Sequence, residues 1–429
     1  MLLVTNLDVW LLSNKVRIPG AGNQSLYNTL LGYANAGYDI HMLTTSMVLK
    51  DVGPIHQRVH IHRMPLRLVD FAVTVSGFLN RLLPWRRRHP RAGGALRMEV
   101  SRNYFIYSRY FRRVMSRRAV KLARQLGGVD LIYGHEVQGA LAGEAAAKAL
   151  GVPLITRFQG TELSRFLDRP EEILKFKTRV AALRADADLV IMSNDGTQGD
   201  KVLDFAGVPR ERYRFLMNGV VKDDVYRPGV DAAAIRRKLG IPDGHSFVLY
   251  TGRMFPWKRV DRLLRVVRRA SEQFDAFTTV IIGDGADMEG SQALARELDL
   301  GKRVIFTGAM AHSEVMDYLN ACDVYVSFHD LTNLCNPAIE ACVCGKCIVT
   351  TAAGGTTDLL SDNVNAVVVP DKDDEEAMTA ALVEVLRNPQ KRAALARGAF
   401  ERGKSLKTWE ERMKQEIAEV EAVLEKKRR

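Results

Sequence analysis

Short apolar segments alternate with amphipathic segments along most of this 429-residue chain, and this alternation limits the folds that the chain can adopt. In the first part of the chain, apolar runs typical of buried strands occur at residues 2–6, 38–45, 129–135, 152–160 and 187–194. Segments with a helical spacing of apolar residues lie between them, at 22–37, 139–151 and near 170–184. Such alternation predicts parallel β-sheet with helices on both faces.

The same alternation restarts after residues 226–231, which read YRPGVD. A second series of strands is predicted at 246–253, 278–285, 303–308, 323–328, 347–351 and 366–370. We therefore predict an α/β chain of two doubly wound, Rossmann-like domains facing each other across a cleft, at residues 1–226 and 227–405. Residues 406–429 are predicted to form a charged helix that can cross back to the first domain. In this architecture ligands bind at the carboxyl ends of the strands.

Positive charge is concentrated in one segment. Arg81–Arg124 contains 13 Arg and one Lys against the single acid Glu99, which gives this segment a net charge of +13. The whole chain has a net charge of +12, so the rest of the chain sums to −1. Aromatic residues interleave with the arginines, and the apolar run Leu68–Leu83 adjoins them. Such a segment can bind nucleic acid, lie on anionic lipid or form a solvated helical face. Because of the adjoining apolar run, we favour an anionic membrane surface over nucleic acid for the insertion at about 66–124.

Export and membrane-spanning patterns are not expected. The opening residues, MLLVTNLDVWLL, lack a basic leader and a small-residue cleavage site, and read as a first strand. No run reaches the roughly 18 to 20 uncharged apolar residues that a membrane span needs. The cysteines all lie between Cys322 and Cys347, and no histidine lies among Cys342, Cys344 and Cys347, which favours buried packing residues over a metal site. These features predict a cytoplasmic protein, peripherally associated with the inner face of the membrane.

Two loops at the ends of predicted strands carry candidate binding residues. In TGRMFPWK, Arg253 and Lys258 lie five residues apart across a turn. Such a pair suits a diphosphate, because Arg offers a planar fork and Lys a point charge. In GDGAD, Gly283 and Gly285 leave the backbone free to approach a ligand, or they simply turn the chain.

Two further loops precede predicted helices. In DLTNLCNPAIEACVCGK, Asn336 suits the N-cap of a short helix, and Glu340 lies near its start, where it can accept hydrogen bonds from a ribose diol or stabilise the first turn. In IPGAGNQS, Gly20 and Gly22 precede a helix whose amides can face an anion, although a plain turn is the alternative.

Together these segments resemble glycosyltransferase family 4, the retaining sugar-nucleotide enzymes of GT-B fold. The donor-binding domain of that family is matched in order and spacing by GRMFPWKRVDRLL, IIGDGADMEGSQALARELDLGKRVIFTGAM, LNACDVYVSF, IEACVCGKCIVTTAAGGTTDLL and VVVP. The N-terminal half is similar more loosely, through GAGNQSLYNTLLGYANAGYDIHMLT, YGHEVQG and MNGVVKDDVYRP. The resemblance covers most of the chain. It implies a GT-B fold and a UDP- or GDP-sugar as co-substrate, with no other cofactor.

The resemblance also implies roles for individual residues. Arg253 and Lys258 would stabilise the departing nucleotide diphosphate, and Glu340 would hold the ribose hydroxyls. Gly20–Gly22 would close over the phosphates. His135 occupies the place of the family's histidine near the sugar, although a strand-end histidine held by hydrogen bonds is the alternative.

One position departs from the family pattern. The family usually has two glutamates with seven residues between them, the first followed by Gly-Phe-Gly, and counting back from Glu340 puts Thr332 at the first position. The carboxylate that normally approaches the donor sugar is therefore missing. The side chain of Thr332 or Asn333 can still orient the sugar, and Asp330 is close enough in sequence to substitute. Backbone amides are also available in this loop, those of Asn333, Leu334 and Cys335.

The segment Asp186-Ala187-Asp188 resembles the metal-binding Asp-x-Asp of a different glycosyltransferase fold. Here it lies at a helix-to-strand junction, where aspartate caps or faces solvent, so we predict transfer without a metal, with cations and helix N-termini supplying the electrostatics. The predicted function is retaining transfer of a sugar to a lipid-linked or glycan acceptor in cell-envelope polysaccharide or glycolipid synthesis. The alternatives are a soluble enzyme acting on a small metabolite or sugar phosphate, and a non-catalytic partner subunit that binds nucleotide sugar.

Overall fold

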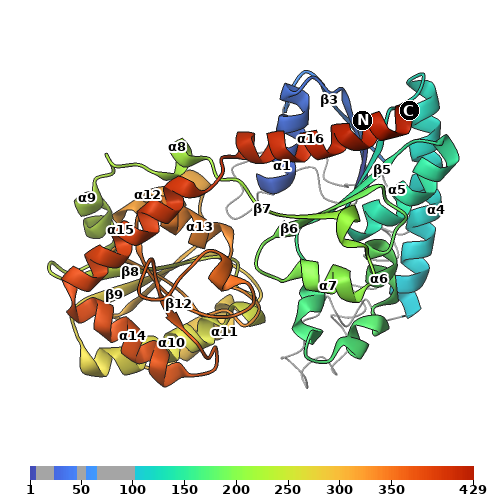
Figure 1. Cartoon of the computed structure of the whole chain (residues 1–429). Helices are drawn as coiled ribbons and strands as arrows, with labels where there is room; N and C mark the ends of the chain where they lie inside the picture. Colours follow the sequence, from blue (N-terminus) through green and yellow to red (C-terminus); the bar gives the residue numbers. More distant parts are fainter. Residues whose placement is uncertain (6–23, 46–54, 65–101) are drawn as a thin grey trace.

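The computed structural model describes residues 1–5, 24–45, 55–64 and 102–429 (Figure 1). The predicted phosphate-facing glycines, Gly20 and Gly22, lie outside these residues, as does the basic insertion up to residue 101. Two parallel sheets organise the described chain, as the alternating pattern predicts.

The first sheet has seven strands in the order β3-β2-β1-β4-β5-β6-β7. Its strands are β1 (Leu2–Thr5), β2 (Ile40–Thr44), β3 (Val59–Arg63), β4 (Ile132–His135), β5 (Leu154–Phe158), β6 (Leu189–Asn194) and β7 (Tyr213–Met217). The helices around it are α1 (Gln24–Asn35), α4 (Arg102–Gln125), α5 (Glu136–Leu150), α6 (Lys177–Leu183) and α7 (Gly199–Phe205). The strands β3 and β7 and the helix α7 were not predicted.

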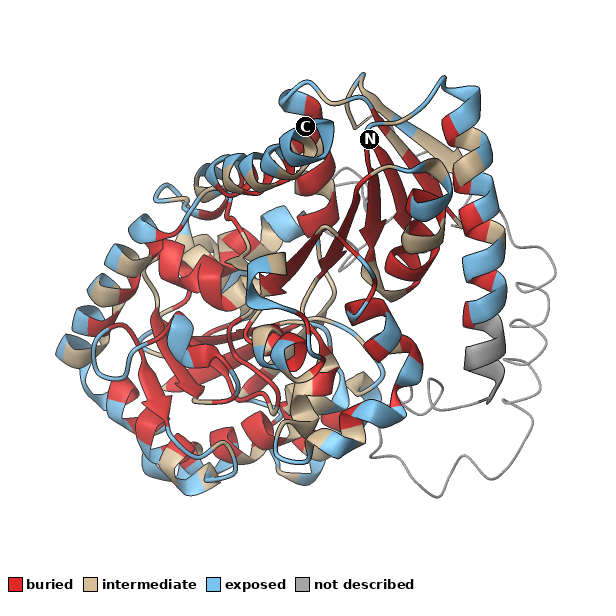
Figure 2. Ribbon diagram, turned by 45° about the vertical axis from the view of Figure 1, so that its right-hand side comes forward, coloured by how far each residue is buried: buried red, intermediate tan, exposed pale blue. Residues whose placement is uncertain are grey.

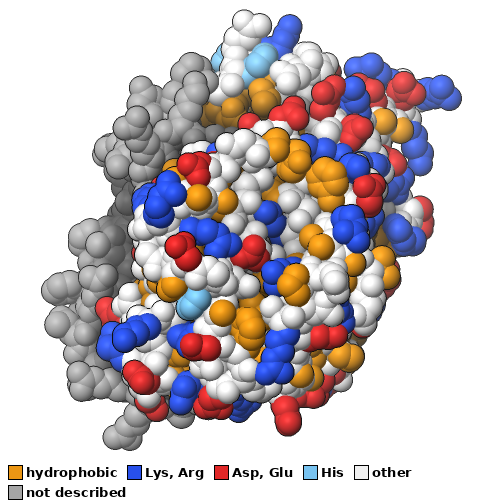
Figure 3. Space-filling view, turned by 90° about the vertical axis from the view of Figure 1, so that its left-hand side faces the viewer, with side chains coloured by type: hydrophobic (Ala, Val, Ile, Leu, Met, Phe, Trp, Pro, Cys, Tyr) orange, Lys and Arg blue, Asp and Glu red, His pale blue; other side chains and the backbone are white. Residues whose placement is uncertain are grey.

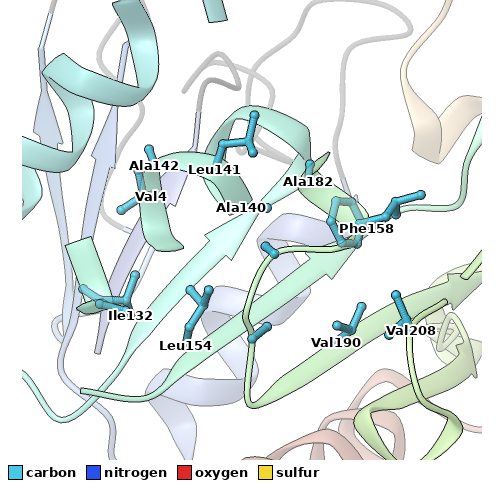
Figure 4. Packing of buried hydrophobic residues seen from close by; sticks show 14 of the residues in the cluster. Val4, Ile132, Ala140, Leu141, Ala142, Leu154, Phe158, Ala182, Val190 and Val208 are labelled. Atoms are coloured by element: carbon cyan, nitrogen blue, oxygen red, sulfur yellow. The ribbon is translucent and has the colours of Figure 1, made fainter. Parts of the chain in front are cut away.

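Both faces of this sheet are buried. In β1, Leu2 and Val4 point into one core while Leu3 points into another, because successive side chains of a strand alternate between faces. Helices α4 to α7 contribute to the first core (Figure 4), and α1 contributes to the second. Burial on both sides explains why the strands read as continuous apolar runs (Figure 2).

The second sheet has six strands in the order β10-β9-β8-β11-β12-β13. Its strands are β8 (Ser246–Thr251), β9 (Phe277–Ile282), β10 (Val304–Gly308), β11 (Val324–Ser327), β12 (Cys347–Thr351) and β13 (Val367–Val369). The surrounding helices are α8 (Lys222–Val225), α9 (Ala232–Leu239), α10 (Val260–Gln273), α11 (Met288–Glu297), α12 (His312–Ala321), α13 (Asn336–Val343), α14 (Glu375–Arg387) and α15 (Pro389–Ser405). In sequence order the strands run 3-2-1-4-5-6, the order of doubly wound nucleotide-binding folds, so the order reverses between β8 and β11.

The last helix, α16 (Trp409–Arg428), leaves the second domain and packs on the first (Figure 1). Met413, Ile417 and Val420 enter the core that α1 and the first sheet form. Gly32 of α1 has no room for a side chain, because an added Cβ would lie 2.5 Å from Met413. The helix therefore completes the core of the first domain.

The second half of the basic insertion forms α4. Phe111, Met115, Ala119 and Ala123 recur every four residues and are buried against the first domain. The basic side chains from 109 to 124 are exposed on the other side of this helix. By contrast, Lys, Arg, Asp and Glu are interspersed over the face of the second domain shown in Figure 3. Among the described residues, no helix combines the length and the hydropathy that a membrane span requires.

Two local predictions were wrong. The helix predicted near 170–184 is divided into a 3₁₀ segment, Pro170–Lys175, and α6, because Phe176 with ψ of 58° interrupts the helical backbone. The N-cap of α13 is Cys335 in an extended conformation, and Asn336 is already the first helical residue. The second difference moves the start of α13 by one residue, within the ordinary uncertainty of a helix boundary.

Candidate functional site

The predicted donor-binding residues gather at the carboxyl ends of β8 and β11, the strands on either side of the point where the strand order reverses. Arg253 and Lys258 follow β8, and the loop to α13 follows β11. In open α/β sheets this point is where ligands bind.

The cations after β8 have different surroundings. Lys258 is half-buried, with its Nζ 4.2 Å from the centre of the Trp257 ring and 3.3 Å from Nδ1 of His329. Burial lowers the pKa of Lys258, and the charges of Cys335 and Asp195 oppose the shift. Burial and the charge of Lys258 hold the pKa of His329 well below its usual range, so His329 is neutral beside it.

Arg253, by contrast, is exposed. Within the described ranges its guanidinium has no hydrogen bond or ion pair that would compete with a ligand. One cation is thus held in a buried setting and the other is free at the surface.

The glycines after β9 have a packing role. Gly283 (φ 145°) and Gly285 (φ 155°) face the neighbouring loop, where an added Cβ would lie 1.8 Å from the carbonyl oxygen of Gly252 and 2.4 Å from that of Met254. Gly283 is therefore needed for the close approach of two strand-end loops, rather than for the approach of a ligand on its Cβ side.

Glu340 is buried in α13, and its carboxylate lies 2.8 Å from Nε2 of His312. Burial lowers the pKa of His312, but the hydrogen bond and charge of Glu340 outweigh it and raise the pKa above its ordinary value. A small cavity of about 40 Å³ lies beside the pair and is lined from both domains, by Asn28 and Trp409 among others. Asn336 also lines this cavity. His312 was not predicted, because nothing in its local sequence marks it as a partner of α13.

The loop before α13 is held by its own hydrogen bonds. Oδ1 of Asn333 accepts from the amide of His329 at 3.0 Å, and Nδ2 donates to the carbonyl of Thr351 at 3.0 Å. The buried side chain of Asn333 is therefore committed to the loop, and the prediction that it orients the sugar is not supported by its position.

The amides of this loop are partly committed as well. That of Asn333 donates to Oγ1 of Thr356, and that of Leu334 donates to Oγ1 of Thr332. In the part of the chain that the structure describes, only the amide of Cys335 among the predicted three lacks an acceptor within the protein.

Asp330 does not take the place of the missing glutamate. Its Oδ1 lies 3.0 Å from Nη1 of Arg259 and 2.9 Å from Nη2 of Arg262. Arg262 is almost fully buried and also contacts Asp373. The carboxylate of Asp330 thus neutralises these arginines.

On the first domain, His135 ends β4 and is fully buried. Burial, and then the charge of Arg157, lower the pKa of His135 to about 3, so the ring is neutral. Neither ring nitrogen has a hydrogen-bond partner among the described residues, which does not support the alternative of a histidine fixed by hydrogen bonds. A buried polar group of this kind is rare, so the described residues do not account for the hydrogen-bonding capacity of His135.

Two carboxyl groups near His135 were not predicted. Glu136 has φ of 62° and accepts a hydrogen bond from the amide of Gln159, and burial raises its pKa to about 7. Asp195 follows β6, and burial raises its pKa to about 6. Shifted carboxyl groups cluster at functional sites. Glu136 lies within the YGHEVQG segment, but only His135 of that segment was singled out, and Asp195 lies outside the segments that resemble the family.

A buried charge network links α16 to the first sheet. Oε2 of Glu416 lies 2.7 Å from Nη1 of Arg157 and 2.9 Å from Nη1 of Arg412, and Tyr133 donates to Oε1 at 2.7 Å. Burial alone would raise the pKa of Glu416, but the two arginines outweigh it and hold it below the ordinary value. Arg157 also donates to Oγ of Ser25 at the start of α1. This network positions the first turn of α1.

The Asp-x-Asp segment has structural partners. Asp188 accepts from the amide of Leu154 and pairs with Lys427, while Asp186 pairs with Arg212. Across residues 1–5, 24–45, 55–64 and 102–429, no group of three His, Cys, Asp or Glu side chains is placed to hold a metal ion.

The cysteines form no disulfide. Four are buried, and burial raises the pKa of each of their thiols to about 12: Cys322, Cys342, Cys344 and Cys347. Although Cys344 and Cys347 have Cys-x-x-Cys spacing, these thiols are inert packing groups, as predicted.

Residues 231–402 match the family described as Glycosyl transferases group 1. The second domain is therefore similar to the group 1 glycosyltransferases. The match covers the second sheet and its helices, so the family assignment falls on the domain that carries Arg253, Lys258 and Glu340. The predicted recognition is confirmed.

Curated relatives are similar to this chain at about one residue in four. A D-inositol 3-phosphate glycosyltransferase of Acidothermus cellulolyticus is 28% identical over 295 residues, which cover 64% of this chain and 63% of the relative. A GDP-mannose-dependent alpha-mannosyltransferase of Mycobacterium tuberculosis is 28% identical over 285 residues, covering 65% and 70%. The chain thus spans less than two thirds of the length of the first of these relatives.

Solved structures show the fold over nearly the whole chain. Sucrose-phosphate synthase from Thermosynechococcus elongatus superposes with a TM-score of 0.74 at 19% identity, covering 98% of both chains. An Anabaena protein in complex with UDP-glucose has a TM-score of 0.67 at 19% identity and covers 98% of both chains. The predicted GT-B fold of two Rossmann-like domains is confirmed.

Proposed function

We propose that this chain transfers a sugar, with retention of anomeric configuration and without a metal, from a UDP- or GDP-sugar to an acceptor at a membrane surface. The observation that carries the proposal is the gathering of Arg253, Lys258 and Glu340 at the ends of β8 and β11, within the region that matches the family. The acceptor is a lipid-linked sugar or glycan of cell-envelope polysaccharide or glycolipid synthesis.

The cations act on the leaving group. As the bond between the sugar and the diphosphate breaks, negative charge grows on the phosphate oxygens, and Arg253 and Lys258 stabilise it. Lys258 contributes more, because its charge acts in a buried setting where screening by water is weak. Glu340 accepts hydrogen bonds from the ribose diol, with His312 fixing its orientation.

The transfer needs no nucleophile from the protein. The acceptor oxygen forms the new bond to the anomeric carbon on the face from which the diphosphate leaves, and the acceptor proton passes to a phosphate oxygen of the leaving group. His135 is neutral and buried, with free ring nitrogens within the described part of the chain, so it can bind a sugar hydroxyl without adding a charge.

The exposed basic face of α4 supports the membrane acceptor. Ser116, Arg117, Lys121, Arg124 and neighbours line a groove of about 540 Å³ between α4 and α5. Each basic side chain near an anionic lipid surface contributes about 1 kcal/mol of binding free energy, so several together suffice for peripheral attachment.

The test is release of nucleoside diphosphate by the purified protein from UDP-glucose, GDP-mannose, ADP-glucose and dTDP-glucose, with and without EDTA. Slow release from one donor, unchanged by EDTA, is the expected result. Binding of a nucleoside diphosphate without release from any donor would favour a non-catalytic partner subunit, and release abolished by EDTA would contradict metal independence.

A small-metabolite acceptor is the second candidate, because several relatives are described as D-inositol 3-phosphate glycosyltransferases. Adding D-inositol 3-phosphate to the donor screen separates the two. Acceleration of nucleotide release by this compound, together with no retention on anionic vesicles, would favour the small acceptor over the membrane-bound one.

A further inference from the structure

The loop between β11 and α13 presents no unpaired carboxylate to the donor sugar. Thr332 stands at the usual glutamate position, and its hydroxyl oxygen accepts from the amide of Leu334 at 3.0 Å. Asp330, the nearest acid in the loop, is bound by Arg259 and Arg262. A carboxylate for the sugar must therefore come from elsewhere.

The loop after β6 of the first domain touches this position directly. The amide of Gly355 donates to the carbonyl of Gly196 at 2.7 Å, and Nδ2 of Asn194 donates to Oδ2 of Asp358 at 2.9 Å. A Cβ added to Gly196, which has φ of 79°, would lie 2.0 Å from Oγ1 of Thr332. The two domains are thus in contact at Thr332, and the loop from Asn194 to Gly196 makes that contact.

Asp195 lies in the middle of this loop, and its carboxylate is fixed on one side only. Oδ1 accepts from the amide of Thr197 at 3.0 Å and from its hydroxyl at 2.6 Å. Oδ2 has no hydrogen-bond partner among the described residues. Gly160, with φ of 90°, makes room for it, because a Cβ there would lie 2.2 Å from Oδ2.

The surroundings of Asp195 combine ionisation with partial burial. Burial raises its pKa to about 6, and Lys258 of the other domain is among the groups that oppose the shift. The carboxyl group is therefore mainly ionised near neutral pH, and its field is felt at the cation assigned to the diphosphate. An ionised carboxylate with one unpaired oxygen is a strong acceptor for a hydroxyl.

We propose that Asp195 supplies, from the opposite domain, the carboxylate that contacts a hydroxyl of the transferred sugar in place of the missing glutamate. This inference rests on the proposed function. The sugar site is then complete only when the loop from Asn194 to Thr197 rests on the second domain. The competing explanation is that Asp195 only shapes its own turn through Thr197.

The test compares each sugar nucleotide with its own nucleoside diphosphate, by calorimetry on the full chain near neutral pH. The probes are UDP-glucose against UDP and GDP-mannose against GDP, with wild type, Asp195→Asn and Asp200→Asn. Asp195→Asn keeps an oxygen for Thr197 and has nearly the same shape. Asp200→Asn, in the first turn of α7, removes the same charge nearby and is the matched control.

For the donor that binds, Asp195→Asn should weaken the sugar nucleotide about 10- to 100-fold, because a hydrogen bond to a charged group is lost. The nucleoside diphosphate should bind as in wild type, and Asp200→Asn should change neither. Equal affinity of Asp195→Asn and wild type for the sugar nucleotide, or an equal loss for both ligands, would overturn the inference while leaving the proposed function intact. If wild type binds none of the four probes, the proposed function fails, and the inference fails with it.

Discussion

On the second domain, the candidate site presents Arg253 and Lys258 after β8 and Glu340 from α13, which follows β11. On the first domain it presents His135, which is neutral, and the carboxyl groups of Glu136 and Asp195, whose pKa values are raised by burial. One side thus offers cations suited to a diphosphate, and the other offers a neutral histidine and two carboxyl groups as acceptors for hydroxyl groups. The difference fits our proposal that the two domains bind opposite ends of a nucleotide sugar.

The first domain also depends on the far end of the chain, whereas the second domain is formed by contiguous sequence. Glu416 of α16 is fully buried against Arg157, so Glu416→Ala leaves a buried guanidinium without compensation. We expect a loss of about 3–5 kcal/mol in the free energy of unfolding, measured with urea. Glu410→Ala removes an exposed partner of Lys414 and is the control, with little change expected. A similar small change in both variants would mean that α16 is not needed to complete the first domain.

Removing the buried cation should have the largest effect on turnover. Lys258→Ala should slow nucleotide release by about 10²- to 10³-fold, because the charge on the leaving diphosphate is then unsupported. Lys258→Arg keeps the charge, and Lys238→Ala removes a surface lysine that pairs with Glu314. Arg253→Ala should also slow release, but less than Lys258→Ala, because Arg253 is exposed. Full turnover in Lys258→Ala would contradict the proposal that the second domain stabilises the leaving diphosphate.

The raised pKa of Glu136 predicts a pH dependence of stability. Its folded pKa of about 7 lies above the unfolded value of roughly 4.3, so the folded state holds the proton more tightly. The associated stability is present below the unfolded pKa and is lost as pH rises through about 7. Between roughly pH 5 and pH 8 this amounts to about 2 kcal/mol.

Glu136→Gln keeps an oxygen for the amide of Gln159 and removes the titration. We therefore expect this variant to gain stability relative to wild type at pH 8 compared with pH 5, by urea denaturation at each pH. If the free energy of unfolding of both proteins changed equally between pH 5 and pH 8, the pKa of Glu136 would not be raised in the folded state. The contrast between the first-domain and second-domain sides of the site would then be weaker.

The smallest expected effect concerns the basic face of α4. Arg117→Gln and Arg124→Gln should each weaken binding to anionic phospholipid vesicles by about 1 kcal/mol, or about five-fold. Arg296→Gln removes an exposed charge from α11 of the second domain and should leave vesicle binding unchanged. Equal losses in all three would indicate that net charge, rather than the α4 face, attracts the protein.

Local patterns predicted much of this molecule. The alternation of strands and helices indicated both sheets, because strands buried on two faces read as continuous apolar runs whatever their partners. Missed elements have weaker patterns: β3 (VHIHR) is polar and only half-buried, and α7 is short. The division of the helix near 170–184 was missed because it occurs at Phe176, and phenylalanine is not a residue type that signals a helix break.

In the site, Lys258, Arg253 and Glu340 could be found because each lies in a short segment, directly after a strand or early in the following helix, whose residues are close in sequence. Glu136 and Asp195 could not, because their pKa shifts arise from burial by segments far along the chain. The structural contacts of Asn333 and Gly283 could not be predicted for the same reason. Hydrogen bonds to Thr351 and close packing on Gly252 connect residues that no local motif links.

The sequence by itself determined the α/β class, the two domains and the cationic donor side, because periodicity and short motifs act through neighbours along the chain. Only the tertiary structure decided that α16 completes the first domain through Glu416 and Arg157, and that the loop of Asp195 meets Thr332. The physical reason is that burial and electrostatic pairing depend on distance in space, and folding brings together residues that the sequence separates by hundreds of positions.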